Sequence, residues 1–344
     1  MTPRVLILYT GGTIGMEPSD EGYRPMEAFS DVLRNALASK KGRAGGAGCV
    51  PDFDVLELAN PIDSANLEPA LWTLMAQTLQ AHWAQYTGFV VLHGTDTLAW
   101  TASALSFMLR GTDKPVILTG AQIPLAQARS DGFANLEAAL ALAALPTLRE
   151  VAVFFGRHLY RGNRCVKVSS ASFNAFSSPN YPALAESAIA LQLASDALLP
   201  ASASEFKLPV FGKEAVVIAH IYPGISGRVL ESMVAPLQTR GLLLRSYGAG
   251  NVPDADPEFM AALGRIVARG VTVVNTTQCL AGGVSQGAYQ TSAALTQMGV
   301  VAGGDMTLEA AFAKLHFLLA TEADPLQVRA LFSVPLAGEL TIAG

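Results

Sequence analysis

Short runs of consecutive hydrophobic residues recur along the chain, and segments with helical spacing separate them. The first five runs are Val5–Tyr9, Phe53–Leu58, Phe89–His93, Val116–Thr119 and Val151–Phe155. A continuous rather than alternating run is typical of a strand that is buried on both faces, as in a parallel sheet between two layers of helices. The pattern therefore predicts an α/β fold with a mostly parallel sheet flanked by helices.

Two of the intervening segments have the spacing of amphipathic helices. Pro69 suits the first turn of a helix, and the apolar positions that follow it are Leu71, Met75, Leu79, Trp83 and Tyr86. The same spacing of three or four recurs at Leu98, Ala102, Leu105 and Leu109. We expect both segments to cover the sheet.

The alternation of apolar runs and helical segments stops between Ala185 and Gly212, where small and polar residues predominate. The alternation then resumes with three apolar runs, each followed by a helical segment: Ala215–Ile221, Gly241–Arg245 and Val271–Asn275. A chain of 344 residues is long enough for two domains. We predict an N-terminal catalytic α/β domain over residues 1–190, a linker over 191–213 and a smaller C-terminal α/β domain over 214–344.

Composition narrows the classes of partner. Hydrophobic residues make up 51% of the chain and charged residues 15%, which is typical of an ordered globular enzyme. The net charge is -5 and no run of lysine or arginine is present, so we expect neither nucleic acid nor an anionic membrane as partner. The longest apolar stretch, Ala138–Pro146, is about half as long as a bilayer crossing requires.

The cysteines and the first predicted strand indicate the cellular compartment in which the protein resides. Cys49, Cys165 and Cys279 are far apart and form no C-x-x-C pair, which favours a reducing environment over a disulfide framework or a structural zinc site. The run Val5–Tyr9 is shorter than the apolar core of a signal peptide and indicates a strand instead. We therefore expect a cytoplasmic protein.

Polar residues gather where three predicted strands end. These segments are Thr10-Gly-Gly-Thr-Ile-Gly15, His93-Gly-Thr-Asp-Thr97 and Thr119-Gly-Ala-Gln122. Ligands of open parallel sheets bind at the carboxyl ends of the strands, so we expect one polar site there. The glycines of the first segment could alternatively serve only a tight turn. Nucleotide binding is disfavoured because the P-loop Gly-Lys-Ser/Thr is absent and Thr10 replaces the first glycine of the dinucleotide motif.

Thr13 offers a hydroxyl in this region, and a hydroxyl becomes a good nucleophile only beside a base or a proton relay. The segment after the third predicted strand supplies the carboxylate of Asp96 beside the hydroxyl of Thr95. The alternative for Asp96 is to cap the helix that starts near Thr97. Lys167 would act as a base if desolvation beside these groups lowered its pKa, or it is an ordinary lysine on a strand face.

Metal and serine chemistry lack support in the sequence. The five histidines form no H-E-x-x-H pair, and G-x-S-x-G is absent. His93, at the end of a buried run, fits a satisfied core histidine better than a general base. We expect no metal.

The segments Tyr9-Thr-Gly-Gly-Thr-Ile-Gly15 and Leu92-His-Gly-Thr-Asp-Thr97 together resemble the two active-site motifs of the bacterial L-asparaginases. The resemblance covers nearly the whole chain and is closest to the cytoplasmic type I branch. Further matching segments are Gly22-Tyr23, Ile62–Ser64, Thr101–Leu109, Arg129–Gly132, Leu159–Arg164, Ile221–Ile225, Arg245–Gly248, Thr277–Cys279 and Gly303–Thr307.

The resemblance implies an amidohydrolase that converts L-asparagine into L-aspartate and ammonia without a cofactor. Thr13 matches the nucleophile that forms an acyl-enzyme. Thr95, Asp96 and Lys167 match the second catalytic cluster of the family. Tyr23 matches the tyrosine of a mobile loop that closes over the site and excludes water.

The resemblance also implies how the substrate is held. The backbone N–H groups of Thr95 and Ala121 match the oxyanion hole. The groups that match the binding of the amino-acid end are Asp63 and Asp96 for the ammonium, and Ser64 with the N–H groups around Gly94 for the carboxylate. Asn251 matches a residue that a neighbouring subunit contributes, which implies a homodimer or a homotetramer.

Type I enzymes can also bind asparagine at a second, activating site. Arg245 and Cys279 match residues associated with that site, whereas Cys165 stands where a threonine is common. Neighbouring Val166 also departs from the family pattern. The sequence leaves open whether this allosteric site is retained.

Two other functions compete with asparagine hydrolysis. The same site could act on glutamine or on glutaminyl-tRNA, as in the related amidotransferase subunit, although the absence of a basic patch weighs against tRNA. The chain could also be a non-catalytic protein that binds an amino acid. The joint presence of Thr13, Tyr23, Thr95, Asp96 and Lys167 disfavours that alternative, because binding alone needs no nucleophile.

Overall fold

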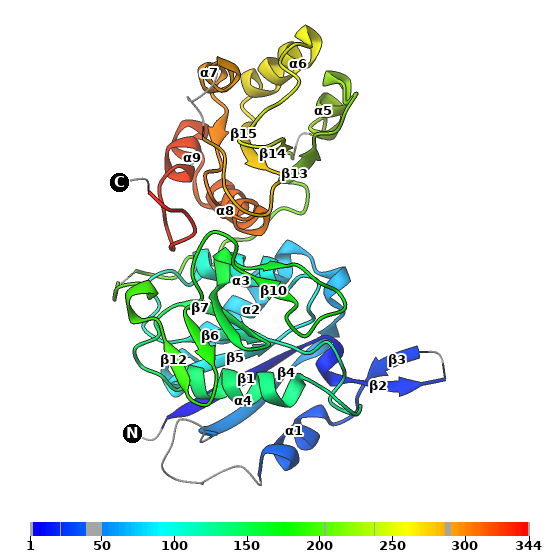
Figure 1. The fold of residues 1–344 in the computed structure, drawn as a ribbon, viewed down its shortest axis with the longest axis vertical. Helices are drawn as coiled ribbons and strands as arrows, with labels where there is room; N and C mark the ends of the chain where they lie inside the picture. The colour runs from blue at the N-terminus through cyan, green and yellow to red at the C-terminus, as the bar shows by residue number, and fades with distance from the viewer. Residues whose placement is uncertain are drawn as a thin grey trace. The chain divides into compact units, whose positions relative to one another are not determined.

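Two compact units make up the chain, Met1–Phe206 and Lys207–Gly344. The structure is a computed structural model that describes residues 3–20, 22–38, 50–202, 204–236, 238–285 and 290–342. Cys49 lies outside the described residues. Each unit has its own sheet with helices on both faces (Figure 1). The division between the units falls within the predicted linker.

The larger unit is built on an eight-stranded sheet of order β12-β11-β8-β7-β6-β5-β1-β4. Its parallel part consists of β1 (Arg4–Gly11), β4 (Asp52–Ile62), β5 (Gly88–Leu92), β6 (Val116–Thr119) and β7 (Val151–Phe155). Each of these strands contains one of the five predicted runs or most of it. The predicted mostly parallel α/β sheet is therefore confirmed.

The other part of this sheet is antiparallel, and none of the five apolar runs covers it. It consists of β8 (His158–Arg161), β11 (Ala185–Ser187) and β12 (Leu191–Leu193). β12 lies inside the segment that we predicted as linker. Leu191 and Leu193 pack against the hydrophobic core of the larger unit, which holds this short strand on the sheet edge.

Helices cover both faces of the large sheet (Figure 1). α1 (Phe29–Ala38) and α4 (Gly132–Ala143) share one core with the sheet, and α2 (Pro69–Ala81) and α3 (Leu98–Met108) lie on the other face. The predicted helical stripe continues beyond Ala81, but the α-helix ends there and a 3-10 turn, η3 (Trp83–Gln85), follows.

Trp83 explains this early end of the helix. Its ring stacks on Phe89 of β5 with 4.7 Å between ring centroids, and its indole N–H donates to Asp113. The chain therefore turns toward β5 before it reaches Tyr86.

The larger unit also contains several short elements outside its main sheet. They are η1 (Thr13–Gly15), the hairpin of β2 (Met16–Ser19) and β3 (Gly22–Pro25), η2 (Ser64–Asn66), η4 (Gly162–Arg164), β9 (Val166–Lys167), β10 (Phe176–Ser177) and η5 (Ser195–Ala197).

The smaller unit has a four-stranded parallel sheet. Its strands, in spatial order, are β13 (Val216–His220), β14 (Gly241–Ser246), β15 (Thr272–Thr277) and β16 (Val301–Ala302). One face carries α5 (Gly227–Met233), α6 (Pro257–Ala268) and α7 (Gln290–Met298), and the other carries α8 (Leu308–Thr321) and α9 (Pro325–Phe332). The predicted second α/β layer is confirmed.

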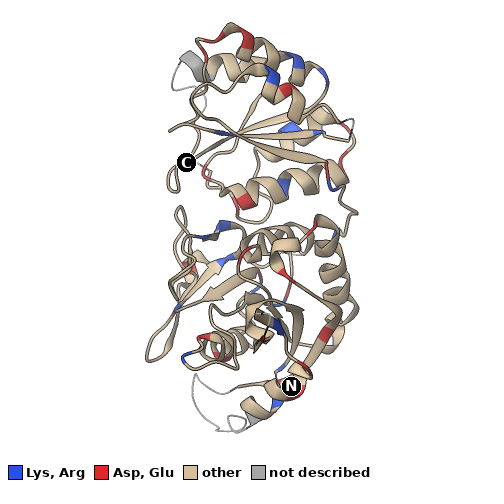
Figure 2. Ribbon diagram, turned by 90° about the vertical axis from the view of Figure 1, so that its right-hand side faces the viewer, with Lys and Arg blue, Asp and Glu red and all other residues tan. Residues whose placement is uncertain are grey.

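Charged residues are spread over both units, with lysines and arginines interspersed among acidic residues (Figure 2). Of the helices that the structure describes, none combines the length and the apolar character needed to cross a bilayer.

The order of strands determines where a ligand can bind in the larger unit. β1 lies between β4 and β5, and the chain leaves β1 toward α1 on one face but leaves β5 toward α3 on the other. The loops after β1 and β5 therefore diverge. Such a topological switch point opens a crevice at the carboxyl ends of the strands.

Candidate active site

Three glycines bring the loops after β1, β4 and β5 into contact. Gly11 and Gly12 have φ values of 120° and 89°, which side chains rarely adopt. A Cβ atom on Gly12 would lie 2.4 Å from the Cα atom of Gly94, and one on Gly11 would lie 2.3 Å from the carbonyl oxygen of Ile62. Thr13 and Thr95 each follow one of the touching glycines, Gly12 and Gly94. The two loops are therefore held together at the predicted site.

The two threonines around the Gly-Gly pair have different environments. Thr10 is buried, and its hydroxyl donates to the carbonyl oxygen of Leu92 at 2.9 Å. Thr13 begins η1 and is half-buried, and within the described chain its hydroxyl has no hydrogen-bond partner. Of these two hydroxyls, that of Thr13 is the one free to approach a ligand.

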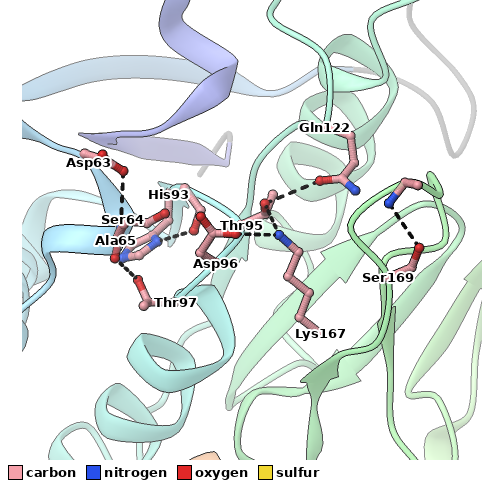
Figure 3. A network of polar contacts seen from close by, with 12 residues as sticks. Asp63, Ser64, Ala65, His93, Thr95, Asp96, Thr97, Gln122, Lys167 and Ser169 are labelled. Carbon is pink, nitrogen blue, oxygen red and sulfur yellow. Dashed lines mark hydrogen bonds and ion pairs between the residues drawn. The ribbon is translucent and has the colours of Figure 1, made fainter.

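A lysine from a distant part of the chain contacts the loop after β5 (Figure 3). The Nζ atom of Lys167 donates to Thr95 Oγ1 at 2.8 Å and to Asp96 Oδ1 at 2.7 Å. Pairing of β9 with β10 sets Lys167 opposite Phe176 and fixes this segment. Lys167 is thus not an ordinary strand-face lysine but part of a polar cluster with the two residues that the sequence indicated.

The alternative role for Asp96 as a helix cap is not what the structure shows. The N-cap residue of α3 is Thr97, and its hydroxyl donates to the carbonyl oxygen of Ser64 at 2.8 Å. The carboxylate of Asp96 is left for Lys167, with which it forms an ion pair.

Gln122 belongs to the same network and was not singled out from the sequence. The hydroxyl of Thr95 donates to Gln122 Oε1 at 3.3 Å (Figure 3). Gln122 Nε2 donates to the carbonyl oxygen of Ser172. Its place in the predicted polar segment after β6 was the available signal. A glutamine in a loop is too common to be selected on that signal alone.

Two backbone donors near this cluster are unpaired. Within the described residues, no hydrogen bond is donated by the N–H group of Thr95 or of Ala121. Thr95 is 7% exposed and Ala121 is 1% exposed. Buried N–H groups almost always have a partner, so two such groups beside a polar cluster are suited to hold an oxygen atom of a ligand.

His93 is a satisfied core residue beneath this site. Its Nδ1 lies 2.8 Å from the carbonyl oxygen of Gly94, and its Nε2 lies 3.0 Å from Thr101 Oγ1. Burial lowers the pKa of His93 to about 4, so the ring is neutral near pH 7. A buried neutral histidine with both nitrogens engaged is not a general base for a ligand in the crevice.

The residues expected to hold an amino-acid ligand lie next to the cluster. Asp63 is exposed, caps η2, and accepts a hydrogen bond from the N–H group of Ala65 at 3.1 Å. Ser64 is buried against Gly94, since a Cβ atom on that glycine would lie 2.5 Å from Ser64 Oγ. The structure therefore brings Asp63, Ser64 and Gly94 together with Asp96 (Figure 3).

Tyr23 lies on the β2–β3 hairpin, which leaves the sheet directly after the Thr13 loop. Its side chain is exposed, and its hydroxyl accepts a hydrogen bond of 2.6 Å from Gln127 Nε2 in the segment after β6. The hydrogen bonds of the described residues do not link Tyr23 to Thr13 or to Lys167.

The remaining predicted residues are divided between the units. Arg245 ends close to Cys279, because its Nη2 donates to the carbonyl oxygen of Gln278 at 3.4 Å. Asn251 is an exposed turn residue that pairs with Tyr247. These residues belong to the smaller unit, whereas Cys165 is fully buried in the larger one. Among the described side chains, no group of His, Cys, Asp and Glu is arranged to hold a metal ion.

Comparison with known proteins gives matches over most of the chain. Residues 4–198 match the family model "Asparaginase, N-terminal", and residues 215–332 match "Glutaminase/Asparaginase C-terminal domain". The chain is 43% identical over 337 residues to L-asparaginase 1 of Escherichia coli, covering 98% of each protein.

Solved structures give the same relationship. The crystal structure of L-asparaginase I from Vibrio cholerae superposes with a TM-score of 0.89 at 42% identity, covering 99% of this chain and 100% of the other. The thermostable L-asparaginase from Thermococcus kodakarensis superposes with a TM-score of 0.87 at 32% identity and the same coverage.

Proposed function

The chain belongs to the asparaginase family, and from this premise we propose that it is an L-asparaginase that uses Thr13 as its nucleophile. It hydrolyses the side-chain amide of L-asparagine to L-aspartate and ammonia. The observation that carries the proposal is the cluster of Thr95, Asp96 and Lys167, whose loop contacts the Thr13 loop where Gly94 meets Gly12, together with the unpaired hydroxyl of Thr13 among the described residues. A hydroxyl nucleophile requires such a proton-accepting group within reach.

The reaction proceeds in two steps. In the first, Thr13 Oγ1 attacks the amide carbon of the substrate, and the amide nitrogen leaves as ammonia after it takes up a proton. The resulting aspartyl ester on Thr13 is then cleaved by water, which restores the hydroxyl. Lys167 joins Thr95 and Asp96 by hydrogen bonds, and we assign the uptake and return of the proton in each step to this cluster, with the carboxylate of Asp96 as the proton acceptor.

Charge that develops on the amide oxygen needs donors in a fixed place. The unpaired N–H groups of Thr95 and Ala121 supply them, at no cost to any existing hydrogen bond. Oxyanion stabilisation of this kind acts on the transition state rather than on the bound substrate.

The amino-acid end of the substrate binds on the side of Asp96 where Asp63 and Ser64 lie, away from Lys167 (Figure 3). The exposed carboxylates of Asp63 and Asp96 pair with its ammonium, and Ser64 with the N–H groups around Gly94 holds its carboxylate. Tyr23 on the β2–β3 hairpin closes over the bound substrate and excludes water, for which its bond to Gln127 has to change.

The assembly and its regulation are also proposals. Asn251 reaches the active site of a neighbouring subunit in a homodimer, and two dimers pair into a homotetramer. Arg245 and Cys279, which lie close to each other, are candidate residues of an activating site, and Cys165 is a further residue that the family resemblance connects with that site. The low charge and separated cysteines favour a cytoplasmic enzyme of asparagine catabolism, with a small-molecule substrate and no nucleic-acid or membrane partner.

Ammonia release from asparagine and glutamine, measured in parallel on the purified chain, tests the proposal. We expect asparagine to be preferred in kcat/KM by roughly 10- to 200-fold, the range that one methylene group provides. A preference for glutamine would favour a glutaminase. Binding of either amino acid without ammonia release would favour the non-catalytic alternative.

A further inference from the structure

The two unpaired N–H groups share a structural feature on the other side of their peptide groups. The Thr95 N–H belongs to the Gly94–Thr95 peptide, whose carbonyl oxygen accepts from His93 Nδ1 at 2.8 Å. The Ala121 N–H belongs to the Gly120–Ala121 peptide, whose carbonyl oxygen accepts from Asn135 Nδ2 at 3.0 Å. Each donor is therefore backed by a hydrogen bond from a buried side chain.

Peptide geometry connects the two sides. The atoms of a trans peptide group lie in one plane, with the C=O and N–H bonds pointing in opposite directions. A side chain that holds the carbonyl in place therefore also fixes the direction of the N–H bond. A hydrogen bond to the carbonyl further polarises the group and strengthens its N–H as a donor.

His93 can act only as a donor toward Gly94. A carbonyl oxygen has no proton to give, so Nδ1 carries the proton and Nε2 must accept from the hydroxyl of Thr101. The carbonyl oxygen of Gly94 thus selects the tautomer of His93, and the α3 residue Thr101 satisfies the other ring nitrogen (Figure 3 shows His93 beside the Thr95 loop).

Asn135, on α4, is equally constrained. Its Oδ1 accepts from the N–H group of Gly156 at 3.1 Å, so its Nδ2 must face Gly120. The same Nδ2 donates to Asp131 Oδ2 at 3.1 Å, and Asp131 also accepts from the N–H group of Gln122. The amide cannot turn over without loss of three hydrogen bonds.

The two peptide groups are also tied to each other. The N–H group of His93 donates to the carbonyl oxygen of Thr119 at 2.9 Å, directly before Gly120. A Cβ atom on Gly120 would lie 2.4 Å from the carbonyl oxygen of His93. The ends of β5 and β6 are therefore packed as one rigid support.

We propose that His93 and Asn135 are positioning residues that aim the N–H groups of Thr95 and Ala121 at the oxyanion by holding the carbonyls of Gly94 and Gly120. This inference rests on the proposed function, in which those N–H groups stabilise the transition state. Neither side chain touches the substrate. Their loss should therefore lower kcat and leave KM nearly unchanged.

Substitutions at both positions test the inference. Removal of one oxyanion donor costs about 10²- to 10³-fold in kcat, so misalignment of one should cost roughly 10- to 100-fold. We expect this loss in His93→Leu and in Asn135→Leu, with KM within about threefold of the wild type. In His93→Asn an amide N–H takes the place of Nδ1, so kcat should recover at least tenfold over His93→Leu. Ser106→Ala, which removes a buried hydrogen bond within α3, serves as the matched control and should keep kcat within about twofold.

Three kinetic results would overturn the inference: a folded His93→Leu with wild-type kcat, a His93→Asn no more active than His93→Leu, or a loss confined to KM. ¹⁵N NMR of the histidine-labelled wild-type chain gives a second test that needs neither activity nor a folded variant. The expected signal of His93 is that of a neutral ring protonated on Nδ1, and protonation on Nε2 would contradict the proposal. Failure of the wild-type chain to release ammonia would contradict the proposed function instead, while the tautomer would still decide whether His93 holds Gly94.

Discussion

The ammonium of Lys167 lies 2.8 Å from the hydroxyl oxygen of Thr95, although 72 positions separate the two residues in sequence. The contact depends on two independent parts of the fold. β5 ends directly before the Thr95 loop, and the β9–β10 pair carries Lys167. Asp96 completes the arrangement by pairing with the same ammonium.

Lys167→Met should abolish the proton path at little cost to folding, because the side chain is partly exposed. We expect kcat for ammonia release to fall by about 10²- to 10⁴-fold, the usual contribution of an acid–base group. Lys207→Met is the matched control, since Lys207 belongs to the smaller unit and pairs only loosely with Glu322 at 3.9 Å. A Lys167→Met variant as active as Lys207→Met would remove Lys167 from the mechanism.

Gly12→Ala should damage the site more than backbone strain alone explains. Gly12 and Gly224 have nearly equal φ values, 89° and 86°, but a Cβ atom on Gly224 meets no atom within 4 Å. Both substitutions place a side chain at a positive φ, a backbone conformation that side chains rarely adopt. Only Gly12→Ala also forces the Gly94 backbone away.

Urea unfolding and ammonia release of the two glycine variants separate these effects. We expect Gly12→Ala to be the less stable variant and to lose at least about tenfold in kcat/KM, while Gly224→Ala keeps the activity. Equal loss of activity in both variants would show that the Gly12–Gly94 contact is unimportant.

Glu309 should make the stability of the chain depend on pH. It is 7% exposed on α8, its Oε2 has no partner among the described residues, and burial raises its pKa to about 7. The unfolded chain loses this proton near pH 4.5, whereas the folded chain keeps it until about pH 7. The folded state is therefore favoured below pH 4.5, and this contribution is lost as the pH rises through 7.

Glu309→Gln removes this proton equilibrium. The stability of the variant relative to the wild type should be greater at pH 8.5 than at pH 5.5 by about 2 kcal/mol, measured by urea unfolding at both values. The buried His93 and His316, whose pKa values are lowered to about 4, destabilise both proteins equally at low pH. A difference between variant and wild type that does not change with pH would refute the assignment.

The apolar runs in the sequence were sufficient for the five parallel strands of the large sheet and for β13, β14 and β15 of the second sheet, whereas the two-residue strand β16 was not predicted. Every residue of β5, β6 and β7 is buried, and such continuous apolar runs give a strong signal. β11 and β12 are only three residues long, and they are the two outermost strands at one end of the sheet, where polar residues such as Glu186 and Gln192 are tolerated. Their packing on the core, rather than any local pattern, makes them strands.

The candidate site was predictable where a residue type is unusual in its setting. Thr13 and Asp96 stand in glycine-rich segments at strand ends, and the family resemblance named their partners. Asn135 could not be found in this way, because in the sequence it is one polar residue at the start of an apolar helix. Its function in the site depends on a carbonyl of another element, Gly120, and such contacts exist only in the folded chain.

The most direct test of the account is ammonia release from saturating L-asparagine by the wild type, Thr13→Ala and Thr10→Val. The two threonines flank the same Gly-Gly pair, but the hydroxyl of Thr10 is committed to Leu92. We predict that Thr13→Ala loses at least about 10³-fold in kcat, as expected for loss of a nucleophile, while Thr10→Val stays within about tenfold of the wild type. Release of ammonia by Thr13→Ala at the wild-type rate would contradict the account.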